Sequence, residues 1–231
     1  MPYEINASSA TPRLLILLTD ELEESVKVVN RIIDDIIMIN WSGEAPKNRC
    51  FISVIGYNHN VKELCSGWLK DLETSPLRSE TLKKNVPDGA GGIVEVEFKQ
   101  PVWVVPVANN PIVEDYVNAI DFTKELINEW VKKEKLSPIV LDCSTKCYAN
   151  NSMEEIKQLK QISSIDGPVL FFGSYSEINN VSHDIFSMMP QIWENSFMRW
   201  DLSSIDYSEG LFKREHIFSI IGAMFSRVGA W

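Results

Sequence analysis

Basic residues are too few in this 231-residue sequence to balance the acidic ones. Lys and Arg total 22 and Asp and Glu total 32, which gives a formal net charge of −10. Nucleic-acid backbones and anionic membrane surfaces bind proteins through an excess of positive charge. The composition therefore argues against a nucleic acid or a membrane as the main partner.

Long hydrophobic runs are also missing. No apolar stretch approaches the roughly 20 residues that a membrane-spanning helix needs. The first twelve residues, MPYEINASSATP, lack the basic start and the apolar stretch of a signal peptide. Hydrophobic residues nevertheless make up 45% of the chain, which is typical of a globular protein with a sizeable core. We therefore expect a cytoplasmic globular protein.

Cysteine and histidine are scarce, and neither is spaced for a metal site. The four cysteines, Cys50, Cys65, Cys143 and Cys147, include no C-x-x-C pair. Two of them lie in apolar, strand-like runs, which predicts buried free thiols rather than disulfides or zinc ligands. None of the three histidines stands at ligand spacing to another His, Cys or Asp. We expect neither a bound metal nor a cofactor.

The usual sequence signatures of an enzyme on an α/β sheet are absent. There is no G-x-x-x-x-G-K-[ST] phosphate loop, and GAGG at 89–92 leads into an expected strand rather than a helix. There is no G-x-S-x-G motif either, because FGSYS at 172–176 lacks the second glycine. Nucleotide binding and serine-hydrolase chemistry of these common kinds are therefore not indicated.

Strand-like and helix-like segments alternate from end to end. Short continuous apolar runs predict strands buried on both faces, and apolar stripes at helical spacing predict amphipathic helices. GIVEVEF at 92–98 alternates apolar and polar residues, as a half-exposed hairpin strand does, and 101–108 would be its partner or the next sheet strand. The other expected strands are 13–19, 50–57, 138–144 and 167–175, and the expected helices are 21–40, 111–133, 152–162 and a C-terminal stripe from Ile217 to Val228.

This alternation predicts an α/β fold of the Rossmann-like, doubly wound kind. Its central sheet would be mostly parallel, with helices on both faces and a β-hairpin insertion. No linker, repeat or low-complexity tract interrupts residues 1–231, so we expect a single domain.

The acidic stretch TDELEES at 19–25 directly follows the first expected strand. Asp20 and Glu23 have the spacing of a helix capping box, in which the first side chain accepts from free backbone amides and the second reaches back. Asn110 followed by Pro111 similarly suits a helix N-terminus, and Ser152 with Glu155 repeats the capping-box spacing. Helix capping alone would explain these polar residues.

The order of segments resembles the von Willebrand factor A family, in particular its bacterial tellurite-resistance-type members. The similarity lies in five blocks: RLLILLTDELEESVKVVNRIIDDII, FISVIGYNHNVKEL, DGAGGIVEVEFKQPVWVVPVANNPIVEDYVNAIDFTKELINEWV, SPIVLDCSTK and GPVLFFGSYS. The resemblance implies a vWA-like fold. It also implies a metal-ion-dependent adhesion site at the carboxyl ends of the strands, where hard oxygen ligands hold a divalent cation.

This sequence departs from the family pattern at each ligand position. Where the family has Asp-x-Ser-x-Ser, either Thr19 or Asp20 takes the aspartate position, and neither register keeps a serine. Asn110 stands at the threonine position and Thr145 at that of the second aspartate. The resemblance therefore implies a degenerate adhesion site that has lost its cation.

The resulting expectation is a non-enzymatic protein–protein interaction module. Its partner would be another protein, for which the resemblance suggests a kinase, a phosphatase or a stress-response protein. The expected binding rim comprises Thr19, Asp20, Glu21, Glu23, Asn109, Asn110, Ser144 and Thr145.

Two alternatives remain open. One is a hydrolase-type enzyme that uses Asp20, Asp142, Ser144 and His59, where Asp142 would have a raised pKa because it lies in an apolar strand. The other is a structural subunit of a larger assembly, because the chain has seven tryptophans and ends on Trp231.

Overall fold

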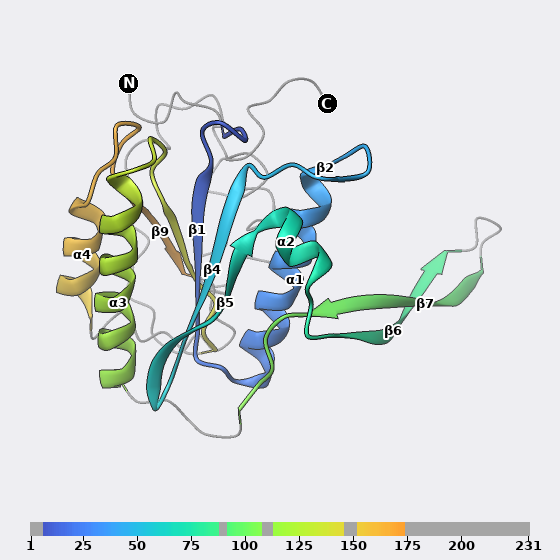
Figure 1. The fold of residues 1–231 in the computed structure, drawn as a ribbon. Coiled ribbons are helices and arrows are strands. Elements are labelled where there is room, and N and C mark those ends of the chain that lie inside the picture. Colours follow the sequence, from blue (N-terminus) through green and yellow to red (C-terminus); the bar gives the residue numbers. More distant parts are fainter. Residues whose placement is uncertain (1–6, 88–91, 108–112, 146–151, 174–231) are drawn as a thin grey trace.

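The centre of the protein is a five-stranded, mostly parallel sheet flanked by helices on both faces (Figure 1). The computed structural model describes residues 7–87, 92–107, 113–145 and 152–173. The strand order is β5-β4-β1-β8-β9. β1 pairs in parallel with β4 and β8, β8 pairs in parallel with β9, and β5 pairs with β4 in antiparallel orientation. The strands are β1 Arg13–Thr19, β4 Cys50–Asn58, β5 Asn60–Trp68, β8 Ile139–Asp142 and β9 Leu170–Gly173.

Two apolar layers hold the helices against this sheet. On one face, Leu15 and Leu17 of β1 pack with helices α1 (Glu23–Ile39) and α2 (Leu69–Thr74). On the other, Leu14, Ile16 and Leu18 pack with helices α3 (Val113–Val131) and α4 (Met153–Gln161). Alternate residues of a strand point to opposite faces, so a continuous apolar run such as β1 fills both layers. This arrangement confirms the predicted α/β class with a mostly parallel sheet.

Most predicted elements are present with shifts of a few residues. The helices expected at 21–40, 111–133 and 152–162 correspond to α1, α3 and α4. Cys50 and Cys143 are buried free thiols, as predicted, and Cys65 is free and partly buried. The expected C-terminal helix and Cys147 lie outside the described residues, and the single domain over 1–231 stays a prediction.

The capping-box prediction for α1 was wrong. The helix begins at Glu23, and its N-cap is Leu22, which makes no side-chain capping hydrogen bond. Asp20 instead accepts hydrogen bonds from the Leu22 amide, from the Ser25 hydroxyl and from Thr145 after β8, and Glu23 pairs with Lys27 on the surface. Ser152 is the N-cap of α4, but its buried hydroxyl also makes no capping bond.

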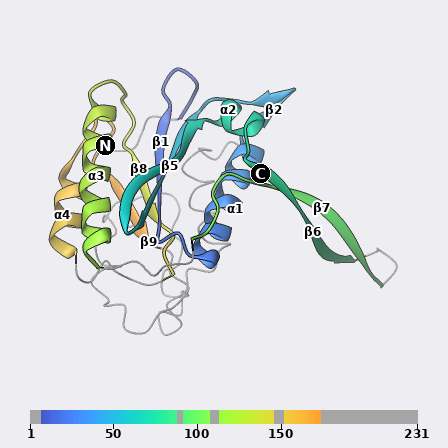
Figure 2. The same cartoon turned by 60° about the horizontal axis from the view of Figure 1, so that its bottom comes forward.

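A two-stranded antiparallel ribbon projects from the body, here called the arm (Figures 1 and 2). It consists of β6 (Arg78–Pro87) and β7 (Ile93–Val102). The prediction of a hairpin strand at 92–98 is confirmed. The separate strand expected at 101–108 is not found among the described residues of that range, because 101 and 102 are the end of β7 and residues 103–107 form no strand. β7 pairs with β6, which precedes it in the sequence. A second, very short ribbon pairs β2 (Trp41–Ser42) with β3 (Ala45–Pro46).

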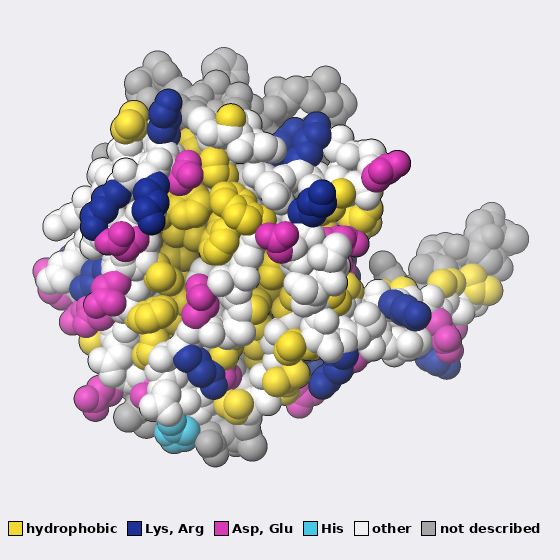
Figure 3. Space-filling model, viewed as in Figure 1, with side chains coloured by type: hydrophobic (Ala, Val, Ile, Leu, Met, Phe, Trp, Pro, Cys, Tyr) yellow, Lys and Arg dark blue, Asp and Glu magenta, His cyan; other side chains and the backbone are white. Residues whose placement is uncertain are grey.

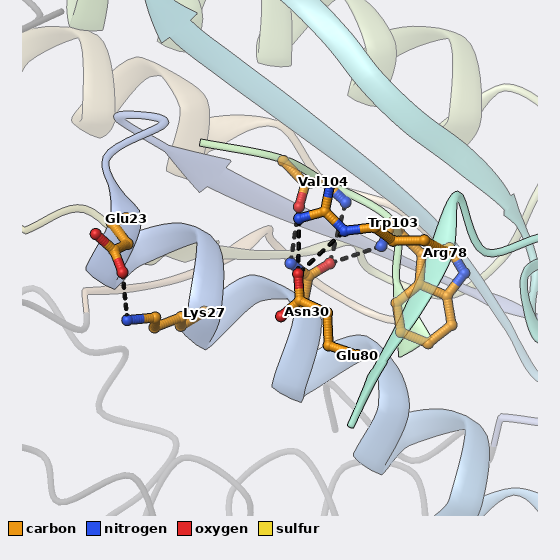
Figure 4. A network of polar contacts seen from close by, with 7 residues as sticks. All are labelled: Glu23, Lys27, Asn30, Arg78, Glu80, Trp103 and Val104. Atoms are coloured by element: carbon orange, nitrogen blue, oxygen red, sulfur yellow. Dashed lines mark hydrogen bonds and ion pairs between the residues drawn. The ribbon is translucent and has the colours of Figure 1, made fainter. Parts of the chain in front are cut away.

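The base of the arm is fixed to the middle of α1 by one buried asparagine (Figure 4). The Asn30 side-chain oxygen accepts hydrogen bonds from the backbone amides of Trp103 at 2.8 Å and Val104 at 3.0 Å. Its amide group donates to the Val104 carbonyl at 2.9 Å. Because these groups are buried, losing any of the three bonds would cost free energy. Asn30 therefore sets where the arm leaves the body.

Candidate functional site

The candidate site lies at the carboxyl ends of the parallel strands, where polar residues follow β1, β4 and β8. The strands are in register there, because Thr19 pairs with Gly56 and Leu18 pairs with Asp142. Ligands of open α/β sheets bind at this edge. The residues that the chain places here are Thr19, Asp20, Glu21, Asn58, Ser144 and Thr145, all of them buried.

The Asp20 carboxylate is the centre of the site, and both of its oxygens accept hydrogen bonds from the protein. Oδ2 accepts from the Thr145 backbone amide at 2.7 Å and from the Thr145 hydroxyl at 2.5 Å. Oδ1 accepts from the Leu22 amide at 3.2 Å and from the Ser25 hydroxyl. Four donors of the protein therefore satisfy a fully buried carboxylate.

Glu21 lies beside Asp20 but points toward β4. Its φ of 57° is in the left-handed region, which is uncommon for a residue other than glycine. Its Oε1 accepts from the Asn58 amide at 3.1 Å, and its Oε2 lies 3.1 Å from the ammonium group of Lys62. The lysine thus places a positive charge next to this buried carboxylate, which offsets part of the cost of burying it.

Gly56 makes room for this glutamate. A Cβ atom on Gly56 would lie 2.6 Å from Glu21 Oε1 and 2.8 Å from a methyl group of Leu64. Both contacts are closer than real Cβ atoms approach, so a side chain here would displace the Glu21 carboxylate. The absence of a side chain at the end of β4 is therefore what admits Glu21 to the edge.

The backbone after β1 is fixed by its own polar side chains. The Glu21 amide donates to the Thr19 hydroxyl at 3.1 Å, and the Asn58 side-chain amide donates to the Asp20 carbonyl at 3.0 Å. The Glu21 carbonyl accepts from the Val107 amide at 2.9 Å. The segment that joins β1 to α1 is thus held to β4 and to the segment leading to α3.

A second buried network surrounds Asp142 at the end of β8. The Tyr116 hydroxyl donates to Asp142 Oδ2 at 2.9 Å, and the Ser144 amide donates to Oδ1 at 3.1 Å. The Ser144 hydroxyl contacts both Asp142 and the Tyr57 hydroxyl. Burial raises the pKa of Asp142 to about 6, although the bonds from Ser144 and Tyr116 oppose the shift. This confirms the raised pKa that the sequence predicts.

The structure brings five of the eight predicted rim residues together: Thr19, Asp20, Glu21, Ser144 and Thr145. Glu23 lies apart from them on the exposed side of α1, where it pairs with Lys27 at 2.6 Å (Figure 4). The hydrogen bond from Lys27 lowers the pKa of Glu23. Asn109 and Asn110 lie outside the described residues.

Several residues of the site were missed by sequence reasoning. Ser25 lies inside the quoted acidic stretch, five residues after Asp20, but it does not match the spacing of the family motif. Asn58 directly follows a strand that was predicted to be parallel to β1, so its position at the same edge of the sheet could have been predicted. The contact between Lys62 and Glu21 had no such signal, because Lys62 lies in a strand that the sequence did not predict.

The residues considered for hydrolase chemistry are not arranged as an accessible catalytic group. His59 is exposed in the turn between β4 and β5, with its backbone amide donating to Asp115 at 3.3 Å. Ser144 is only 1% exposed, and its hydroxyl is engaged by Asp142 and Tyr57. Cys143, which directly follows Asp142, is a further side chain that could act as a nucleophile. Burial raises the pKa of its thiol well above the usual value, which makes it a poor one.

Two further findings concern metals and membranes. Among the residues that the structure describes, no three His, Cys, Asp or Glu side chains converge as a metal site requires. Within the same part of the chain, no helix combines the length and apolar character needed to cross a bilayer.

Comparison with known proteins gives no family assignment. No protein-family model, curated protein or solved structure matches this chain. The site therefore has to be interpreted from its own residues and geometry.

Proposed function

We propose that this protein is a non-enzymatic, vWA-like interaction module that has lost its cation site and binds another protein through the rim of its strand ends. The observation that carries the proposal is the Asp20 carboxylate, whose two oxygens accept hydrogen bonds from Leu22, Ser25 and Thr145. A divalent cation needs carboxylate lone pairs that are free to coordinate it. Here the donors of the chain itself already use these lone pairs, which supports the proposal that the cation site has been lost.

Glu21 and Lys62 support the same proposal. In a cation site of this type, a second acidic side chain would share the positive charge of the ion. Glu21 instead faces the Lys62 ammonium at 3.1 Å. The positive charge that balances this carboxylate is therefore built into the protein.

Partner binding would then depend on exposed side chains around the buried carboxylates. Val105 is exposed and lies two residues before Val107, whose amide bonds to the Glu21 carbonyl. His59 and Asn60, in the adjacent β4–β5 turn, are exposed as well. Without a metal–carboxylate bond, binding must rest on apolar contact and hydrogen bonds from such residues. The partner remains a protein of unknown identity, with a kinase, a phosphatase or a stress-response protein suggested by the family resemblance.

Metal dependence tests the loss of the cation site. We expect the melting temperature of the full chain to be the same in EDTA and in millimolar Mg²⁺, because a ligand stabilises a fold only if it binds the folded state. Isothermal titration with Mg²⁺ should show no saturable heat. A rise of several degrees with Mg²⁺ would contradict the proposal.

A matched pair of variants tests the rim. Val105→Asp places a charge on an exposed apolar residue at the carboxyl edge. Ile165→Asp makes the same change at another exposed apolar residue, next to Asp166, which pairs with Arg13 at the start of β1 and so marks the opposite edge. Proteins captured from the source cells by the full chain should be lost with Val105→Asp, kept with Ile165→Asp and insensitive to EDTA. Equal capture by both variants would refute binding at the rim.

A further inference from the structure

Strand β5 forms one edge of the central sheet, and its outer side is open. The strand order places β5 at the end of the sheet, where it pairs with β4 alone. Within the part of the chain that the structure describes, no other strand or loop makes backbone hydrogen bonds to residues 60–67. Such an edge presents a row of unpaired amides and carbonyls, with which an extended segment of another chain can pair.

One irregularity interrupts this edge. The register shifts between Val54 and Ile55 of β4, so that Leu64 of β5 has no partner there. Bulges of this kind are among the features that keep sheet edges from pairing indiscriminately. A strand that adds to β5 must therefore have side chains that match those of β5.

Half of the β5 side chains point to the face of the sheet that carries α3. Residues that lie directly opposite each other in an antiparallel pair point to the same side. Ile55 and Tyr57 of β4 pack on the α3 face, and Phe51 packs against the same apolar cluster. The β5 residues that pair with β4 residues of this face are Val61, Glu63, Ser66 and Trp68.

The Trp68 end of this row of side chains is aromatic. The rings of Phe51 and Trp68 meet edge to face with their centroids 5.2 Å apart, and Trp130 of α3 lies 6.0 Å from Phe51 and 6.3 Å from Trp68. All three residues are partly exposed, and Figure 3 shows hydrophobic side chains gathered on the surface between α3 and β5. Packed aromatic rings that remain accessible suit an aromatic or aliphatic side chain of a partner.

The Glu63 end of the row is acidic. Glu63 is exposed, and its carboxylate accepts a hydrogen bond from the Ser53 hydroxyl at 2.7 Å. The neighbouring Lys62 pairs with Glu21 instead, and no Lys, Arg or His among the described residues forms an ion pair with Glu63. This carboxylate therefore attracts a positive charge from outside the described part of the chain.

We propose that β5 is a strand-addition site, at which an extended segment of another protein pairs with the edge and matches Trp68 and Glu63. The β4 residues opposite these two, Phe51 and Ile55, are four positions apart, so a strand on the outer side of β5 spans the same distance with four residues. The segment thus carries an aromatic or large aliphatic residue beside Trp68 and, four positions away, a Lys or Arg beside Glu63.

This surface is separate from the rim proposed above to bind another protein. Trp68 pairs with Phe51 near the start of β4, whereas the rim lies at the carboxyl ends of the parallel strands. Strand addition at β5 therefore does not depend on binding at the rim.

Selection of peptides on the full chain, from a phage-displayed library of random 12-residue peptides, tests the proposal. The wild type should enrich peptides with the pattern above, and a synthetic copy of an enriched peptide should slow hydrogen exchange of the β5 amides. Glu63→Lys should enrich Asp or Glu in place of Lys or Arg, and should bind the wild-type peptide at least about ten-fold more weakly.

Two further variants serve as controls. Glu63→Gln keeps an acceptor for the Ser53 hydroxyl, so it should lose the preference for a basic residue and keep the preference for the aromatic or aliphatic one. Glu97→Lys makes the same change in net charge as Glu63→Lys at an exposed position of the arm and should select peptides like the wild type. Circular dichroism spectra show whether each variant is folded.

The other outcomes overturn strand addition at β5. Failure of the wild type to enrich any peptide means that the edge accepts no strand. Equal affinity of an enriched peptide for Glu63→Lys and for the wild type places the peptide elsewhere, and unchanged exchange of the β5 amides shows that it does not pair with the edge. If Glu63→Lys is unfolded, Glu63→Gln decides, because an unchanged preference for basic residues in that variant refutes the role of Glu63.

Discussion

Replacing Asp20 by alanine should strongly destabilise this protein. The change removes the acceptor for the Thr145 amide and hydroxyl and for the Leu22 amide. The Ser25 hydroxyl can still bond to the Leu22 carbonyl, 2.9 Å away. Losing a buried charged acceptor with several donors costs about 3–5 kcal/mol. In a chain of this size each kcal/mol lowers the melting temperature by roughly 2–4 °C, so we expect a decrease of about 10 °C.

The sign of this effect separates the proposed site from a site built for a cation. In a cation site without its ion, the neighbouring carboxylates of Asp20 and Glu21 would repel each other. Removing one of them would then leave stability unchanged or increase it. A decrease is expected only if Asp20 is already satisfied by the protein.

Urea unfolding followed by circular dichroism measures the free energy directly. Glu23→Ala is the matched control, because it removes a nearby acid that is exposed and paired only with Lys27, and it should change stability little. Thr145→Val keeps the backbone bond and removes only the hydroxyl, for a loss of about 1 kcal/mol. The reasoning is refuted if Asp20→Ala is as stable as Glu23→Ala or more stable than the wild type.

Two further predictions concern the edges of β4 and β8. Gly56→Ala should lower the melting temperature, because its methyl group would lie 2.6 Å from Glu21 Oε1. Gly67→Ala is the control and should be tolerated, because its methyl group meets no atom closer than 3.4 Å. Equal melting temperatures of the two variants would contradict this account of the packing. The pKa of Asp142 is about 6 in the folded protein and 3.8 ordinarily, so between these values the folded state keeps a proton that the unfolded chain has lost. Stability from this group should therefore fall as the pH rises from about 4 to 6, by at most about 3 kcal/mol. Asp142→Asn should remove that part of the pH dependence in urea titrations, and an unchanged profile would show that burial of the carboxyl is not its cause.

The helices and strands that could be predicted are those whose secondary structure is specified by their own residues. β1 and β4 are continuous apolar runs, and α1 and α3 have apolar stripes that suit no other conformation. β5 was missed because NVKELCSGW has no clear alternation, and its strand state comes from pairing with β4 across a register shift at Val54 and Ile55. β6 was missed for a similar reason, since RSETLKKNVP is mostly polar and is a strand because β7 pairs with it.

The order of strands and helices along the chain indicates which residues gather at the edge of the sheet, whereas the role of each residue there depends on tertiary packing. Parallel strands end at the same edge, so residues that follow β1 and β8, such as Asp20 and Thr145, had to lie close together. The bonds from Thr145 to Asp20 and from Asn58 to Glu21 join residues far apart in sequence, and no local pattern specifies such pairs. Glu21 turns inward and Glu23 outward because of the backbone angle at Glu21, the space left by Gly56 and the start of α1. Those depend on how the chain packs in three dimensions, and only the folded protein fixes them.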